Sequence, residues 1–163
     1  MDPETLRILQ AADDSRECEV PSGFDWDRES SRARQLVPVL EEIVGRKFHV
    51  ESPQDASFFA DVTTYDDRKT PGGTTVRTTV LAVRLSSFGK LFSLWAIKSM
   101  HRDGRWTTGD HPSIAEETKR RVIEAVRHRD NVYVDFDDLQ EPYTGANPHF
   151  VGRTWWVRFF DYI

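Results

Sequence analysis

Two groups of closely spaced acidic residues are the clearest candidates for chemistry in this sequence. The first group is Asp135, Asp137, Asp138 and Glu141, and the second is Asp66 and Asp67. Carboxylates that are brought together can bind a hard cation such as Mg²⁺, or a basic protein partner. Acidic residues also keep an exposed strand edge soluble, and we favour this simpler interpretation. We therefore predict no metal site.

Histidine, cysteine and glycine do not occur at the spacings that common catalytic and cofactor sites require. The five histidines are scattered, without the i, i+4 or Cys-paired spacing of zinc sites. Cys18 is the single cysteine and lies between two glutamates, whose charge disfavours the reactive thiolate. Pro71-Gly72-Gly73 lies between two strand-like segments, which is typical of a hairpin turn rather than of a phosphate-binding loop. The sequence predicts no catalytic residue and no cofactor.

The balance of charge disfavours nucleic acid as a partner. The chain has 27 acidic and 22 basic residues and a formal charge of -5, whereas affinity for phosphate is built largely on Lys and Arg. Its densest basic run comprises Lys119, Arg120, Arg121, Arg127, His128 and Arg129. Glutamates one helical turn earlier, such as Glu116 before Arg120, can pair with several of these cations. We expect the run to stabilise its own helix.

Length and hydropathy are those of one soluble domain. The chain has 163 residues, of which 38% are hydrophobic, enough for a single core without disulfides. Its first residues are acidic rather than basic, and no apolar run approaches the roughly 18 residues of a membrane span. We therefore expect a cytoplasmic protein without a membrane partner.

Strand-like and helix-like segments alternate along the chain. Residues 57–65, 74–85 and 90–99 are rich in Val, Thr, Phe, Leu and Trp and are separated by short turns, which predicts a meander of three strands. Apolar residues recur at helical spacing over residues 30–44, before Gly45 as a C-cap, and again over residues 113–129. A helix is therefore predicted on each side of the meander.

The two ends of the chain complete the predicted fold. Residues 1–30 read as a short helix followed by an irregular arm, which Phe24 and Trp26 pin to the body. Residues 132–137 and 154–163 alternate along their length and are predicted to be strands. The prediction is a single α+β domain over residues 31–163. Its order is α-β-β-β-α-β-β, with a mainly antiparallel sheet and the helices packed on one face.

This order of elements resembles the core of metal-dependent nucleases of the restriction-endonuclease type. Such a site needs an acid on one strand, and an acid two residues before a lysine on the next. Asp61 matches the first acid, but the following strands offer Ala82-Val83-Arg84 and Ala96-Ile97-Lys98, which lack the second carboxylate. A divergent nuclease-like enzyme, with a degenerate site or one assembled only in three dimensions, is the alternative hypothesis for function.

The leading hypothesis is a non-enzymatic protein-binding module, such as an inhibitor or an immunity-like protein that masks a basic partner. If both helices cover one face of the sheet, the other face collects aromatic and charged residues together with Asp61. Large patches of this kind mark contact surfaces, either with another protein or in a homodimer. The predicted partner-binding residues are Phe59, Tyr65, Tyr133, Asp135, Trp156, Arg158, Phe160 and Tyr162. A competing interpretation is that the N-terminal arm covers this face.

The basic helix gives a first testable prediction. DNA should bind only weakly and without sequence preference, and binding should vanish near physiological salt, because screening removes an interaction that rests on few free cations. A salt titration of DNA affinity measures this. Submicromolar binding at about 150 mM salt that is abolished by Arg120→Glu with Arg127→Glu would contradict the prediction.

Overall fold

The centre of the fold is the predicted three-stranded meander. The computed structural model describes residues 1–53, 55–95, 97–100, 106–108 and 114–162. Strands β2 (Phe58–Lys69), β3 (Thr75–Ser86) and β4 (Leu91–Trp95) pair antiparallel in sequence order. The predicted third strand ends at Trp95, and part of its remainder forms a separate strand.

Two short strands extend the meander into a five-stranded mixed sheet. Strand β1 (His49–Glu51) pairs antiparallel with β2, and β7 (Val132–Tyr133) pairs parallel with β4, which gives the order β1-β2-β3-β4-β7. Strands β5 (Ile97–Met100) and β6 (Trp106–Thr108) form a second, two-stranded sheet. The fold is therefore the predicted single α+β domain.

Two irregularities interrupt the pairing of β2 with β3, one between Phe58 and Ala60 and one between Thr64 and Tyr65, and they change which side chains share a face. Phe58 pairs with Ser86 and Ala60 with Leu85, so that Phe59 is an extra residue, a β-bulge. Phe59 and Ala60 both belong to the core on one side, whereas Asp61 points to the other side with Arg84. The prediction that Phe59 and Asp61 share a face is therefore wrong, because simple alternation does not anticipate a bulge.

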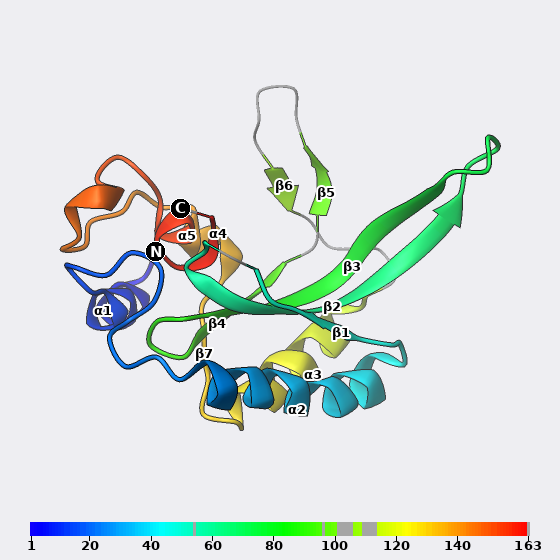
Figure 1. The fold of residues 1–163 in the computed structure, drawn as a ribbon, viewed down its shortest axis with the longest axis horizontal. Coiled ribbons are helices and arrows are strands. Elements are labelled where there is room, and N and C mark those ends of the chain that lie inside the picture. Colours follow the sequence, from blue (N-terminus) through cyan, green and yellow to red (C-terminus); the bar gives the residue numbers. More distant parts are fainter. Residues whose placement is uncertain (54, 96, 101–105, 109–113, 163) are drawn as a thin grey trace.

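Helices α2 (Trp26–Val44) and α3 (Glu116–Arg127) cover one face of the sheet (Figure 1). Gly45 caps α2 with a left-handed backbone (φ 71°), as predicted from the sequence. On α3, Arg120 pairs with Glu117 and Glu124, so its charge is used within the helix. The predicted start of α3 at Ser113 lies outside the described residues. Within the described ranges, no helix has the length and apolar character to cross a bilayer.

The C-terminal segment is helical, and the strand predicted at residues 154–163 is wrong. Helix α5 (Trp155–Phe160) begins where the Thr154 hydroxyl accepts a hydrogen bond from the amide of Val157. Trp155 stacks on Phe159 one helical turn later, at 5.7 Å. Large apolar side chains occupy every side of this segment, so alternation alone could not separate strand from helix.

The predicted strand at residues 132–137 is also shorter than expected. It ends at Tyr133, because the Asp135 carboxylate caps helix α4 (Phe136–Leu139) by accepting from the amide of Asp137. Helix α5 lies on the side of the sheet opposite α2 and α3 (Figure 1). The two helices predicted from the sequence, α2 and α3, do pack on one face, and α5, which was not predicted as a helix, covers part of the other.

A second core joins the two ends of the chain. Its buried residues come from α1 (Pro3–Ala12), α4, the 3₁₀ turn η1 (Pro148–Phe150), α5, the start of β4 and the connecting segments at Phe88, Val134 and Tyr143. At its centre the Arg158 guanidinium is fully buried and donates from Nε to the Asp13 Oδ1 atom at 2.6 Å. Its other nitrogens donate to the backbone carbonyls of Asp14, Glu17 and Cys18. Arg158 thus fixes the N-terminal arm to α5.

Replacing Arg158 should therefore unfold the protein at much lower denaturant. Arg158→Met leaves the Asp13 carboxylate buried without its counter-ion, which costs about 3–5 kcal/mol of the free energy of unfolding. Urea unfolding followed by circular dichroism measures this loss. The control is Arg153→Met, the same change at an exposed position, expected within about 0.5 kcal/mol of the wild type. Equal stability of the two variants would contradict the structural role of Arg158.

Candidate functional site

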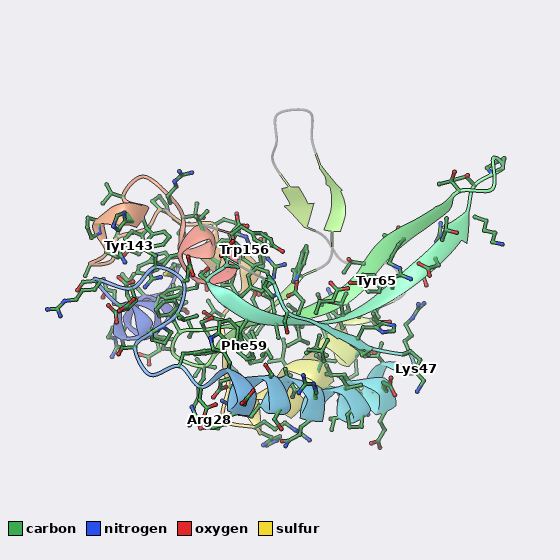
Figure 2. All side chains as sticks on the ribbon, in the orientation of Figure 1. Arg28, Lys47, Phe59, Tyr65, Tyr143 and Trp156 are labelled. Carbon is green, nitrogen blue, oxygen red and sulfur yellow. The ribbon has the colours of Figure 1, made fainter. Side chains whose placement is uncertain are left out.

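The eight residues predicted to form one partner-binding face lie in different parts of the fold. Phe59 and Tyr133 are on the face that α2 and α3 cover (Figure 2 shows Phe59 between the sheet and α2). The Phe59 ring packs against Phe24 at 5.5 Å, and the Tyr133 ring lies beneath the guanidinium of Arg127. Neither residue belongs to the opposite face, so part of the premise for the predicted face is wrong.

Most of the predicted residues near the C-terminus are packed against the face of the sheet opposite α2 and α3. They cover this face and do not form an exposed surface on it. Arg158 and Phe160 are fully buried in the second core. Trp156 is half-buried and packs against Trp95 of β4 at 6.4 Å. Tyr162 is 59% exposed, with its ring against the edge of Phe58. These positions follow from the helix at residues 155–160, which alternation predicted to be a strand.

Asp61 and Arg84 form a buried ion pair under α5. Arg84 donates from Nε and Nη2 to the two carboxylate oxygens of Asp61, at 2.8 and 2.6 Å, and from Nη1 to the Phe160 carbonyl at 2.7 Å. The guanidinium also lies 3.7 Å from the ring centroid of Phe58. Both side chains are almost fully buried. All three donor groups of Arg84 therefore serve the fold.

The ion pair with Arg84 engages both oxygens of the Asp61 carboxylate, which a nuclease-like site would need to hold a metal ion. Asp61 is on β2, whereas Asp135 follows β7, and strands β3 and β4 lie between them. In the part of the chain that the structure describes, no three His, Cys, Asp or Glu side chains are grouped to hold a metal ion. Asp135 is an exposed helix cap that also accepts a hydrogen bond from the Tyr133 hydroxyl.

The face of the sheet opposite α2 and α3 is not covered by α5 where β2 and β3 extend beyond the neighbouring strands β1 and β4. Strand β1 pairs with residues 61–63 of β2, and β4 pairs with residues 82–85 of β3. Residues 65–69 and 75–79 pair with each other beyond these limits, and we call this part of the hairpin the arm. Figure 1 shows the arm projecting from the body of the domain.

Five side chains from β1 and the arm form a connected network on this open side, which we call the arm face. Its members are His49, Glu51, Tyr65, Asp67 and Arg77. The Tyr65 hydroxyl donates to the Glu51 Oε1 atom at 2.5 Å, and the His49 ring stacks on the Tyr65 ring at 6.2 Å. Figure 2 labels Tyr65 on the arm, on the side away from α2.

Arg77 links the ring to the second acid of the network. Its Nε and Nη2 atoms donate to the two Asp67 oxygens at 2.9 and 3.0 Å, and its guanidinium lies 5.0 Å from the centroid of the Tyr65 ring. The hydrogen bonds from Arg77 lower the pKa of the Asp67 carboxyl, which is ionised at neutral pH. The arm face thus presents charges of both signs around one fixed aromatic ring.

The Tyr65 hydroxyl is held as a hydrogen-bond donor. Partial burial, and then the hydrogen bond to the Glu51 carboxylate, raise the pKa of Tyr65 well above its usual range. The hydroxyl therefore stays protonated at neutral pH, which suits recognition rather than nucleophilic attack.

Of the arm face, the sequence predicted only Tyr65. His49 and Glu51 lie on a strand of three residues, too short for alternation to reveal. Arg77 carries no local signal in the sequence, because its contacts with Tyr65 and Asp67 depend on the pairing register of β2 and β3. Asp67 was noted as an acid but could not be assigned a partner.

Comparison with protein-family models, with curated proteins and with solved structures finds no match to this chain. The interpretation of the arm face therefore rests on its geometry and charge. Its central features are the fixed Tyr65 ring and the ion pair of Asp67 with Arg77.

The contrast between the two arginine–aspartate pairs of the sheet gives a testable difference. Asp61→Asn should cost about 3 kcal/mol of the free energy of unfolding, because it leaves Arg84 buried without a full counter-charge. Asp67→Asn should hardly move the unfolding midpoint, because water and salt screen its exposed pair with Arg77. Urea unfolding of both variants makes the comparison. Micromolar Mg²⁺ binding by the wild type that is lost in a stable Asp61→Asn protein would favour the metal-site hypothesis instead.

Proposed function

We propose that this chain is a non-enzymatic protein-binding module that uses the arm face as its contact surface. The single observation that carries the proposal is the arm itself, a two-stranded ribbon that extends beyond the sheet with an ordered network on one side. A ribbon of two strands gains little stability in water. Keeping its side chains fixed therefore favours a role in contact rather than in holding the domain together.

The residue types of the arm face support a protein as the partner. Tyrosine and arginine are the types that most often dominate the binding energy of protein interfaces. Tyr65 and Arg77 are already held in place by Glu51 and Asp67, so less conformational entropy is lost on binding. Such preorganisation increases affinity without additional contacts.

The net charge favours a basic partner. The chain carries a formal charge of -5, and opposite charge on the partner speeds association and selects against wrong partners. An inhibitor or immunity-like protein that masks the basic surface of another protein fits this balance. Self-association of the arm face is the other outcome that the test must distinguish.

The proposal is tested by binding with the arm face altered. The purified chain, immobilised, is exposed to an extract of the cells that express it, and the retained proteins are quantified by mass spectrometry. We expect a retained basic protein, and we expect Tyr65→Ala and Arg77→Glu each to lower its retention about tenfold, as loss of an interface hot spot does. Sedimentation of the purified chain alone reports self-association.

The control is Arg34→Glu, which makes the same charge change on the exposed side of α2. It should retain the partner as the wild type does, and all variants should melt within a few degrees of one another. Retention that is equally weak in the Arg34→Glu control, or that does not depend on Tyr65 and Arg77, would overturn the proposal. So would the absence of any partner together with a monomeric chain.

A further inference from the structure

A second surface feature lies away from the arm face, beside the start of α2. It is a depression of about 430 Å³, lined by Glu19, Val20, Trp26, Pro53, Asp55 and Ala56. Trp26 is 46% exposed, a large fraction for an aromatic side chain that a folded domain could bury. None of these residues belongs to the arm face.

The Trp26 ring is held in position from the hydrophobic core. It meets the Phe24 ring edge-to-face, with the centroids 5.0 Å apart and the planes at 79°. Phe24 in turn packs against the buried Phe59 at 5.5 Å. This row of three aromatic rings supports the indole from one side and leaves part of it exposed to solvent. Of the two residues expected to pin the N-terminal arm to the body, Phe24 contacts the buried Phe59, whereas Trp26 begins α2 and is 46% exposed.

Two acidic residues without counter-ions, Glu19 and Asp55, line the same depression as Trp26. Glu19 and Asp55 are both exposed, and among the residues that the structure describes neither side chain has a hydrogen bond or an ion pair. Many other acids of the chain are paired, as Asp13 is with Arg158 and Asp67 with Arg77. The depression therefore combines negative charge with an available aromatic face.

We propose that this depression binds an arginine side chain of a protein partner. A guanidinium can stack on the indole face of Trp26 while its N–H groups donate to the carboxylates of Glu19 and Asp55. Arginine suits this site better than lysine, because its planar group both stacks on aromatic rings and binds carboxylates through two parallel hydrogen bonds. The inference goes beyond the proposed function, since the depression and the arm face share no residue.

The test is an NMR titration of the full chain with a small probe. The probe is the tripeptide Gly-Arg-Gly with blocked ends, and its control is the same peptide with citrulline, which is nearly isosteric but uncharged. The signal is the indole N–H of Trp26, assigned from its loss in Trp26→Phe. We expect a saturable shift with the arginine peptide that is at least about fivefold weaker with the citrulline peptide, and weaker at high salt.

Charge-matched variants separate the depression from the general acidity of the chain. Glu19→Gln with Asp55→Asn should weaken arginine binding at least about fivefold. Glu42→Gln with Glu141→Gln removes two exposed acids elsewhere and should leave binding unchanged. Melting curves of both double variants confirm that each is folded.

Three results would overturn the inference. They are equal affinity for the citrulline peptide, undiminished binding in the Glu19 and Asp55 double variant, and the absence of a saturable shift at Trp26. Arg77→Glu should leave the titration unchanged. A failed titration beside partner capture that depends on Arg77 would therefore refute the depression alone, and the reverse pattern would refute the arm face alone.

Discussion

The ion pair between Arg158 and Asp13 is the interaction on which the rest of the structure depends. It is fully buried, and a buried pair is favourable only when its remaining donors and acceptors are also satisfied. Arg158 meets this condition through three backbone carbonyls, and Asp13 by accepting from the Tyr143 hydroxyl and the Ala146 amide. Because α5 is fixed in this way, the Phe160 carbonyl is in place to accept from Arg84.

As a result, the face of the sheet opposite α2 and α3 is covered at one end only. Helix α5 covers the end where Arg84 and Asp61 are buried, and Trp156 packs there against Trp95. Farther along β2 and β3 the same face carries exposed, connected side chains around Tyr65. Along these two strands the buried ion pair of Asp61 with Arg84 stabilises the fold, whereas the exposed pair of Asp67 with Arg77 belongs to the surface that we propose for binding.

The sequence was sufficient for elements with strong periodicity and insufficient where contacts are distant. The meander and helices α2 and α3 were predicted correctly, since each has a clear apolar face or a clear turn signal. Helix α5 was missed because Trp and Phe occupy all its sides. Arg158 was assigned to a binding surface because nothing local indicates a partner 145 positions away. Likewise, only Tyr65 of the arm face was predicted. Which side chains lie next to it depends on the pairing register of β2 and β3 and on the irregularity between Thr64 and Tyr65.

The central claim, that the arm face is the contact surface of a protein-binding module, is tested most directly by mapping what a partner covers. Amide hydrogen exchange of the free chain is compared with that of the chain in complex with its captured partner. The account predicts that added protection is concentrated on residues 49–51, 65–69 and 75–79. Protection concentrated instead on the exposed sides of α2 and α3, with no change on the arm, would contradict it.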